Sequence, residues 1–270
     1  KSEKFISNYI PILFNFLYIL SERESKMSLK LQHLIEKSNK LVFFTGAGIS
    51  TNSGIPDFRG PKGVWKTTTP IYFQDFMGSK DKRIESWERK FSNELNIDSA
   101  KPNSGHMKLA EIINKKEESH LITQNVDNLH QDSGIDDSKV TELHGNATYA
   151  KCLNCFARYE LSPLKKDFLA TKEPPSCTIC GGIIKTATIS FGQAMPEEEM
   201  ITAQRVAIKS DLFICLGSSL AVFPAADLPL LAKETGASLV IINNEPTQMD
   251  HLSDLVINRD ISETLSEITL

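Results

Sequence analysis

A glycine-rich turn followed by an aspartate and an arginine lies near the start of the chain, between Leu41 and Arg59. Its sequence is LVFFTGAGISTNSGIPDFR, in which an apolar run leads directly into Gly46 and Gly48. Because glycine has no Cβ, backbone N–H groups could approach a pyrophosphate here, and a following helix N-terminus would add its positive dipole end. Arg59 could add a bidentate contact to a phosphate or a ribose. The stretch favours a nucleotide site, and a plain tight turn is the alternative.

The same stretch differs from the nucleotide loop of an ordinary dehydrogenase. Its glycines are spaced G-x-G-x-x-x-x-x-G, whereas the usual fingerprint is G-x-G-x-x-G. The region about 20 residues further on, WKTTTP, carries no acidic residue for a ribose. The ribose would have to be held from another part of the chain. Asn243 and Glu245, which follow the apolar run 239–242, are the candidates, with a plain strand-ending turn as the alternative.

Four of the five cysteines form two CxxC pairs, and these are Cys152, Cys155, Cys177 and Cys180. Two such pairs at this separation are typical of a tetrahedral zinc site, which we prefer to disulfides in a chain with intracellular features. Four thiolates leave no open coordination position, so we expect one structural zinc ion. The fifth cysteine, Cys215, lies in an apolar run and is expected to be a buried side chain, not a nucleophile.

The composition is typical of a folded cytoplasmic enzyme, with 40% hydrophobic and 24% charged residues. A formal net charge of −4 gives no overall attraction to nucleic acid. A zinc ribbon that binds nucleic acid is the alternative for the cysteine-bearing segment, but few aromatic residues lie between its basic ones. We therefore expect no direct nucleic-acid partner.

The first 26 residues look foreign to the rest of the chain. Residues 5–20 are apolar and aromatic but are interrupted by polar residues and a proline, and they are short for a membrane span. Met27 precedes an amphipathic pattern that predicts a helix. We treat residues 1–26 as an atypical tail with Met27 as the natural start. No membrane contact is expected unless this tail acts as an anchor.

Helix and strand patterns alternate from residue 29 onward, which predicts a parallel α/β sheet. The expected strands are 41–45, 119–123, a third that ends near 143–145, 212–216 and 239–242. The expected helices lie across about 70–97 and after a cap at 102–104. We assign 27–145 and 188–270 to a Rossmann-like domain and 146–187 to a small inserted zinc-binding domain, with a helical insert at about 66–100.

Ligand groups collect at the carboxyl ends of strands in such a sheet. The groups expected to converge on one crevice are Gly46, Gln124, Asn125, His144, Gly217, Ser218, Ser219 and Asn243. His144 follows a strand and precedes a glycine, so its ring would be open to a ligand and could accept a proton near neutral pH. The default for the other histidines is a structural role, and these are His33, His106, His120, His130 and His251. No activated nucleophile is visible, which favours a bound cofactor that acts as co-substrate.

Several motifs taken together resemble the sirtuins. They are GAGIS at 46–50, GIPDFRG at 54–60, TQNVDNLH at 123–130, LHG at 143–145, the two CxxC pairs, FGQ at 191–193, GSSL at 217–220 with Pro224-Ala225, and Ile242-Asn243. They occur in order from about residue 29 to the C-terminus, and their joint order is highly specific.

The resemblance implies an NAD-dependent protein lysine deacetylase with acylated-lysine proteins or peptides as partners. The acyl oxygen would attack the nicotinamide ribose as nicotinamide leaves, and His144 would take a proton from the ribose hydroxyls. The products would be nicotinamide, deacylated lysine and O-acyl-ADP-ribose. An NAD-dependent mono-ADP-ribosyltransferase is the alternative, because both reactions begin by breaking the same bond.

The resemblance also implies roles for individual residues. His144 and Asn125 are the implied catalytic residues. The implied NAD contacts are Asn125 and Asp127 at the ribose and carboxamide, Ile55, Asp57 and Phe58 at the nicotinamide, Ala47, Gly48 and Arg59 at the pyrophosphate, and Gly217, Ser218, Ser219, Asn243 and Glu245 at the adenosine, with Gly46 and Gln124 beside them.

The acylated peptide is expected to add a strand between two segments, Phe191-Gly192 and Leu220 to Val222. Val126, Ile189 and Phe58 are the candidates for the acyl tunnel. The chain has Gln193 where family members usually carry glutamate, which puts some peptide contacts in doubt. Residues 86–91 lack the Tyr-x-x-Arg pair of members that prefer acidic acyl groups, so a neutral acetyl group is expected.

Overall fold

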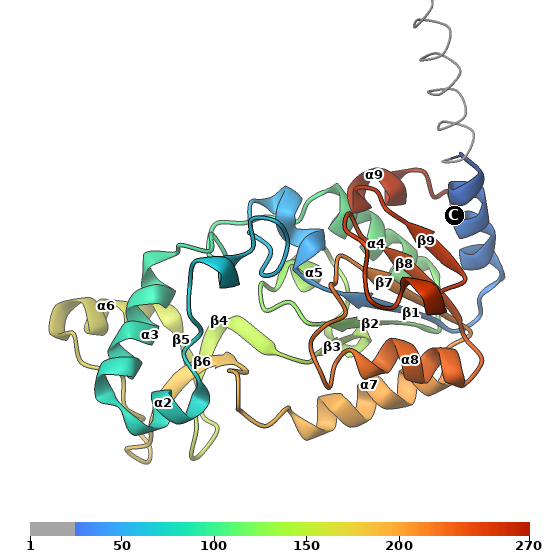
Figure 1. The fold of residues 1–270 in the computed structure, drawn as a ribbon. Helices are drawn as coiled ribbons and strands as arrows, with labels where there is room; N and C mark the ends of the chain where they lie inside the picture. The colour runs from blue at the N-terminus through green and yellow to red at the C-terminus, as the bar shows by residue number, and fades with distance from the viewer. Residues whose placement is uncertain (1–24) are drawn as a thin grey trace, which may run out of the picture.

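The computed structural model describes residues 25–270 (Figure 1). The expectations for the tail therefore lie almost entirely outside the described residues. Residues 25–37 form a helix in which Leu31 and Ile35 are fully buried, whereas Leu29 is 66% exposed. Within residues 25–270, no helix has both the length and the apolar character needed to cross a membrane.

The larger sheet has six parallel strands in the order β3-β2-β1-β7-β8-β9. Their bounds are β1 Leu41–Thr45, β2 Ser119–Thr123, β3 Val140–Glu142, β7 Leu212–Leu216, β8 Ser238–Ile242 and β9 Leu255–Ile257. Strand β1 lies between β2 and β7 and is buried along its whole length. Such an unbroken apolar run is what a strand with both faces covered requires.

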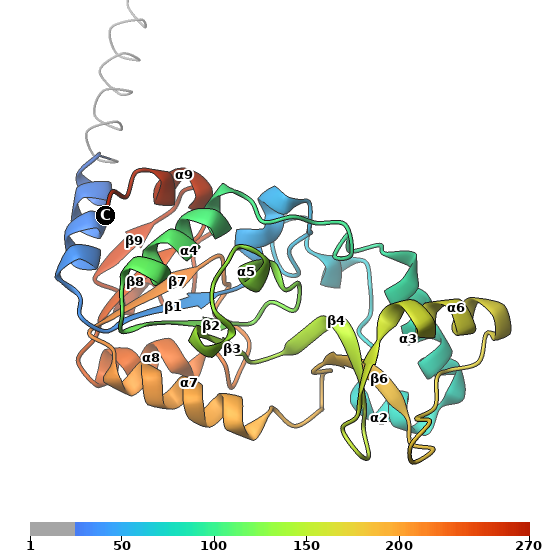
Figure 2. The same cartoon turned by 180° about the vertical axis from the view of Figure 1, so that it is seen from behind.

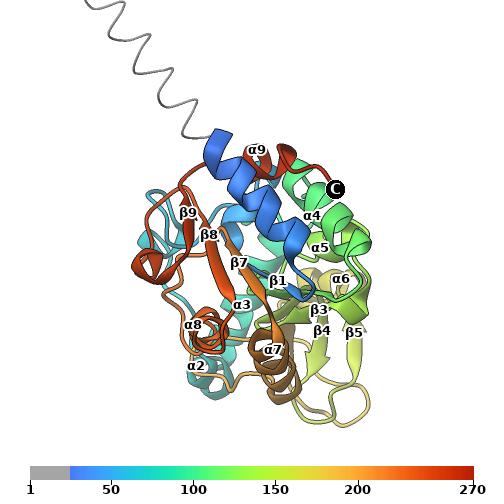
Figure 3. The same cartoon turned by 90° about the vertical axis from the view of Figure 1, so that its right-hand side faces the viewer.

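Helices cover both faces of this sheet (Figures 1 and 3). On one face lie residues 25–37, α4 (Ser104–Lys115) and α9 (Ile261–Ser266); on the other lie α7 (Glu197–Lys209) and α8 (Asp227–Glu234). Each face has its own buried apolar cluster, built from alternate residues of the strands. Asn103 caps α4 by accepting hydrogen bonds from the N–H groups of Gly105 and His106, as the sequence predicts.

The smaller sheet is antiparallel, with the order β5-β4-β6. Its strands are β4 Gly145–Cys152, β5 Arg158–Glu160 and β6 Ile184–Thr188, and α6 spans Leu161–Thr171. Helices α2 (Phe73–Gly78) and α3 (Lys80–Ser92) lie beside it (Figure 2). Trp87 and Phe91 of α3 join Phe168 and Ile184 in one buried cluster. The helical insert and the cysteine-bearing segment therefore share a core.

Short elements connect these parts, namely α5 (Leu129–Asp132) and the 3₁₀ helices η1 (Ala47–Ser53), η2 (Val64–Lys66), η3 (Asp137–Lys139) and η4 (Asp250–Leu252). The predicted parallel α/β sheet is confirmed, and β1, β2 and β7 match their expected bounds. The third strand ends at Glu142, slightly before its expected end. The domain boundaries remain a proposal.

Candidate active site and metal centre

The glycine turn after β1 packs directly against the end of β7. The N–H of Gly46 donates to the Leu216 carbonyl at 3.0 Å, and the N–H of Gly48 donates to the Gly217 carbonyl at 2.8 Å. A Cβ on Gly48 would lie 2.6 Å from the Gly217 Cα. Both N–H groups are thus engaged within the protein. Glycine is required here because two strand ends meet. The contact of this turn with a phosphate stays a prediction.

His144 lies between the end of β3 and the start of β4, with its ring partly buried. Its Nδ1 is 3.0 Å from the Gln124 carbonyl oxygen, which can only accept, so Nδ1 carries the proton and Nε2 is left as the acceptor. Burial lowers the pKa of His144, and the positive charge of Arg59 lowers it further. The ring is therefore a neutral base at neutral pH.

Asn125 and Asp127 are buried at the end of β2, above Ser50. The Ser50 hydroxyl donates to Asp127 Oδ2 at 2.6 Å and accepts from Asn125 Nδ2 at 3.2 Å. Burial raises the pKa of Asp127. His106 supports this group, since its Nδ1 accepts from the Asn103 N–H at 3.3 Å and its Nε2 lies 3.5 Å from the Ser50 hydroxyl.

Sequence reasoning assigned His106 a structural role and did not consider Ser50 individually. His106 does support the fold, but it lies two hydrogen bonds from Asn125 and Asp127. The signal in the sequence was the position of Ser50 inside GAGIS. Only the fold shows that α4 places a histidine beneath it.

The ends of β7 and β8 carry the residues expected to face adenosine. Gln124 Nε2 donates to the Ser218 hydroxyl at 2.8 Å, which joins β2 to the β7 loop. Asn243 Nδ2 donates to the Glu245 carbonyl at 2.6 Å, so this turn is closed on itself. Ser219 is partly buried and the Glu245 residue is exposed. The structure thus brings Gly46, Gln124, Gly217 and Ser218 together, as convergence of strand ends predicts.

The segment after η1 folds back over this edge. Ile55 is buried, and Asp57 Oδ1 accepts from the Gly60 N–H at 2.5 Å. Arg59 is largely exposed, and partial burial lowers the pKa of its guanidinium. Ala47 opens η1 and is partly buried. The loop is therefore ordered by its own hydrogen bonds.

A row of aromatic side chains connects this loop to the FGQ segment. Ring centroids are 5.1 Å apart for Phe58 and Trp65, 5.7 Å for Trp65 and Phe191, and 6.1 Å for Tyr72 and Phe191. The N–H of Phe73 also donates to the Phe191 carbonyl at 2.9 Å. Sequence reasoning missed Trp65 and Tyr72, because their proximity to Phe191 depends on the tertiary fold.

The remaining residues expected at the peptide lie in three segments of the chain, at 126, 189–192 and 220–222. The N–H of Ile189 donates to the His144 carbonyl at 2.8 Å, and the Val126 carbonyl accepts from the Ala147 N–H at 2.7 Å. Leu220 is buried with a φ of 51°, whereas Val222 is partly buried. Gly192 accepts a hydrogen bond at its carbonyl from Gln74. Ile189 is thus hydrogen-bonded to the backbone of His144, and Val126 to the backbone of Ala147.

The four cysteines of the CxxC pairs form a cluster in the small domain. Their Sγ atoms all lie within 4.8 Å of one another, with 3.5 Å between Cys152 and Cys180 and 3.6 Å between Cys155 and Cys177. Sulfurs at the corners of a zinc tetrahedron are about 3.8 Å apart for a Zn–S bond of about 2.3 Å. The donor set therefore fits one structural zinc ion.

Glycine makes the second knuckle possible. Gly181 has a φ of 72°, and a Cβ on Gly182 would lie 2.9 Å from Cys152 Sγ. The backbone must approach the sulfurs closely to donate N–H groups to them. Cys215, by contrast, is buried in β7, where burial raises its pKa, as expected for an apolar side chain.

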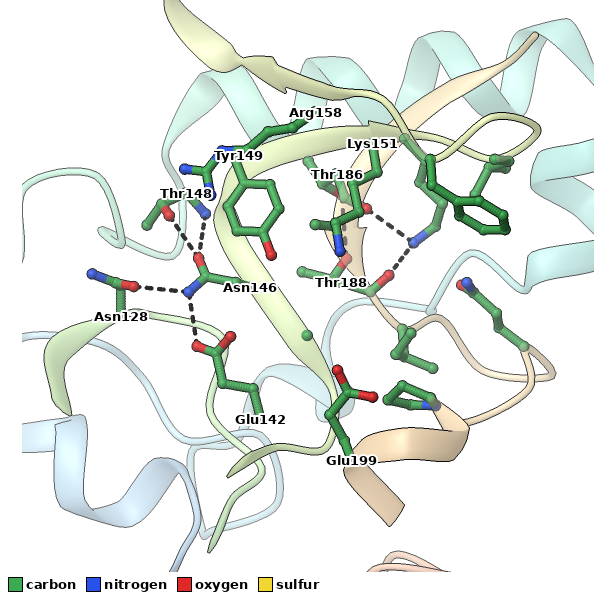
Figure 4. A pocket seen from close by; sticks show the side chains of 18 of the residues that line it. Asn128, Glu142, Asn146, Thr148, Tyr149, Lys151, Arg158, Thr186, Thr188 and Glu199 are labelled. Carbon is green, nitrogen blue, oxygen red and sulfur yellow. Dashed lines mark hydrogen bonds between the residues drawn. The ribbon is translucent and has the colours of Figure 1, made fainter. Parts of the chain in front are cut away.

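A polar cavity of about 600 Å³ lies between β4, β6 and the start of α7 (Figure 4). Glu142, Tyr149 and Glu199 line it, and Ile189 borders it. Glu142 Oε1 accepts from Gln131 and Asn146, and burial raises its pKa. His144 and Asn125 do not line this cavity, but Gly145 and Ile189, which adjoin His144, do.

Comparison with known proteins agrees with this architecture. The family model described as Sir2 family matches residues 46–224. The chain is 50% identical over 236 residues to an NAD-dependent protein deacetylase of Rhodopseudomonas palustris, covering 87% of this chain and 93% of that protein. It is also 50% identical over 236 residues to NAD-dependent protein deacetylase 1 of Bradyrhizobium diazoefficiens, covering 87% and 92%.

Two solved structures show that the similarity extends to the fold. A Sir2 variant with a deacetylated p53 peptide and 3′-O-acetyl-ADP-ribose superposes with a TM-score of 0.81 at 34% identity, covering 88% of this chain and 95% of that one. A Sir2 complex with a p53 peptide and NAD⁺ gives 0.75 at 35% identity, with the same coverage of both chains. Sequence, fold and the cysteine cluster agree, and the chain belongs to the Sir2 family.

Proposed function

We propose that this protein is an NAD-dependent protein lysine deacetylase, with acylated-lysine proteins as substrates. The observation that carries the proposal is His144, a base with a fixed tautomer at the edge where the strand ends converge. Relatives at 50% identity are named NAD-dependent protein deacetylases, and related structures hold NAD or acetylated peptides. The residues suit a cofactor that reacts, because among residues 25–270 no serine or cysteine side chain is hydrogen-bonded to His144.

The polar groups at the strand ends are each proposed to have a separate role. When bound, NAD supplies a ribose carbon that becomes reactive as nicotinamide departs. Asn125 and Asp127 are proposed to orient the ribose and the carboxamide, held in place through Ser50. His144 Nε2 is proposed to take the proton from a ribose hydroxyl, since Nδ1 is committed to the Gln124 carbonyl. Gly217, Ser218 and Asn243 are proposed to face the adenosine half.

The acyl group is proposed to be neutral. Phe58, Val126 and Ile189 are proposed to offer apolar surface to the acyl group, and the aromatic row from Phe58 to Tyr72 is proposed to exclude water from it. Arg59, whose charge lowers the pKa of His144, is proposed to bind the pyrophosphate and not the acyl group. Acetyl-lysine is therefore the preferred substrate.

The cellular setting is proposed to be the cytoplasm, without a nucleic-acid partner. None of the five cysteines is paired in a disulfide, which suits a reducing compartment. The net charge of −4 supports the absence of a nucleic-acid partner.

Mass spectrometry of an acetyl-lysine peptide incubated with the purified protein, with and without NAD, tests the proposal. We expect NAD-dependent loss of acetyl together with O-acetyl-ADP-ribose, and a matched succinyl-lysine peptide should react much more slowly. An intact acetyl peptide with ADP-ribose attached to protein would assign the transferase instead. No consumption of NAD with any acyl peptide would exclude both reactions.

A further inference from the structure

The four sulfurs of the metal centre have unequal surroundings. Each accepts hydrogen bonds from backbone N–H groups of its own knuckle, as CxxC turns provide. Cys152 and Cys177 are buried, whereas Cys155 and Cys180 are exposed. Within residues 25–270, the Tyr159 hydroxyl is the side-chain oxygen that reaches one of these sulfurs, at 3.1 Å from Cys177 Sγ.

The direction of this hydrogen bond follows from its neighbours. The Tyr159 oxygen accepts from the Thr178 N–H at 3.1 Å and lies 3.2 Å from the Thr178 hydroxyl, which can accept or donate. A zinc-bound thiolate carries no proton, so the phenol must be the donor toward Cys177. The tyrosine therefore bonds both the sulfur of one cysteine and the backbone of the next residue.

The strand that carries Tyr159 fixes the position of this hydroxyl. Tyr159 pairs with Ala150 in the register of β4 and β5, and its ring packs against the cluster of Trp87, Phe91 and Phe168. Strand pairing and packing of the ring thus hold the phenol in place, and the hydrogen bond costs little additional ordering. It joins β5 to the second knuckle, which is distant in sequence.

We propose that Tyr159 is a positioning residue of the metal centre that retains zinc by holding the Cys177 thiolate. Zinc with four thiolates carries a net charge of −2, and a donor on one sulfur spreads part of that charge. It also keeps the sulfur turned toward the ion. Partners of this kind typically contribute about 10- to 100-fold in metal affinity. This role is independent of the proposed reaction.

The test compares Tyr159→Phe with Tyr149→Phe. Both variants remove one hydroxyl from the small sheet, but Tyr149 lies on β4, where its hydroxyl points into the polar cavity (Figure 4). The zinc-loaded proteins are mixed with an excess of a chromophoric chelator and the rate of zinc transfer is followed. We expect Tyr159→Phe to lose zinc about tenfold faster or more, and Tyr149→Phe to match the parent within about twofold.

A second measurement separates retention from folding. Native, zinc-loaded proteins are treated briefly with N-ethylmaleimide, and labelled cysteines are identified by mass spectrometry. Faster labelling of Cys177 in Tyr159→Phe, with Cys152 unchanged, supports the proposal, as does recovery of this variant free of zinc while Tyr149→Phe is loaded. Transfer rates for Tyr159→Phe within about twofold of the parent would overturn it. Neither measurement requires NAD or a peptide, so failure of the deacetylase proposal would leave it intact.

Discussion

The hydrogen bond between His144 Nδ1 and the Gln124 carbonyl decides what the histidine can do. It fixes Nε2 as the unprotonated nitrogen, so the ring can accept a proton without first changing tautomer. Gln124 in turn donates a hydrogen bond to Ser218, so the base and the loop that we propose faces adenosine share one residue. The sequence indicated His144 through its place after a strand. The tautomer could be assigned only from the fold, which places the Gln124 carbonyl beside Nδ1.

Replacement of His144 by alanine is expected to reduce NAD-dependent deacetylation by about 100-fold or more, because a general base contributes about 10² to 10⁴. The measurement is the rate of O-acetyl-ADP-ribose formation under saturating NAD and peptide. His33→Ala is the matched control, since His33 is exposed on the helix of residues 25–37. Equal rates for the two variants would remove His144 from the reaction.

The pH dependence of kcat/KM provides a second check on this residue. Burial, with the charge of Arg59, lowers the pKa of His144 below the ordinary histidine value of about 6.5, so the neutral base persists at pH values where an ordinary histidine is already protonated. We expect kcat/KM to be level around neutral pH and to fall only below about 6.5 on acidification. Arg59→Gln should move this fall to higher pH. A fall of kcat/KM that already begins above pH 7 in the parent would contradict a lowered pKa for His144.

At the level of elements, contact between the ends of β1 and β7 is the most demanding feature. Gly217 has a φ of 63°, and a Cβ there would lie 2.6 Å from the Ile49 nitrogen. The sequence explains Gly46 and Gly48 by access to a phosphate, and the family resemblance places Gly217 at the adenosine. The sequence alone could not show that the two turns touch, because the order β1-β7 is a property of the sheet and not of either segment.

Gly217→Ala is accordingly expected to destabilise the protein by about 2 kcal/mol or more and to weaken NAD binding, since backbone atoms that cannot move aside would clash. Urea unfolding gives the stability and calorimetry gives the NAD affinity. Gly78→Ala is the control, because a Cβ at Gly78 meets nothing within 4 Å. Similar unfolding midpoints for the two variants would show that the loops can separate.

The pairing of β2 with β3 predicts a dependence of stability on pH. His120 on β2 lies 2.8 Å from the Thr141 hydroxyl on β3, and burial, with Arg205 and Lys139 nearby, lowers its pKa to about 4. Unfolding restores a value near 6.5, so the unfolded state binds more protons between these values and stability falls as the pH drops through this window. Between pH 7.5 and 5.5, we expect the free energy of unfolding of His120→Gln to fall by about 1 kcal/mol less than that of the parent. Identical losses in urea unfolding would refute this assignment.

For the whole molecule, the zinc centre and the helical insert are parts of one small domain. The buried cluster that contains Cys152 and Cys177 also contains Trp87 and Phe91 of α3. The sequence predicted the metal site from the cysteine spacing and the insert from its helical pattern. It did not predict that the two segments share a core, because the apolar residues that join them are widely separated along the chain.

Removal of zinc is therefore expected to lower the melting temperature and abolish deacetylation, with recovery when zinc is restored. Elemental analysis should find about one zinc per chain. Cys155→Ser should lose the metal, whereas Cys215→Ala should keep it, since Cys215 lies within β7. Full activity after complete removal of zinc would show that the small domain folds without the ion.

The shared core of α3 and the zinc segment also sets how this protein can be recombined with its relatives. A chimera that exchanges only residues 146–187 would pair a foreign Phe168 and Ile184 with the original Trp87 and Phe91. The unit that can be inherited or grafted intact therefore consists of the helical insert at about 66–100 and residues 146–187, both taken from the same parent. Recombination between relatives should therefore succeed when both segments are exchanged together. It should give poorly packed hybrids when only one of them is exchanged.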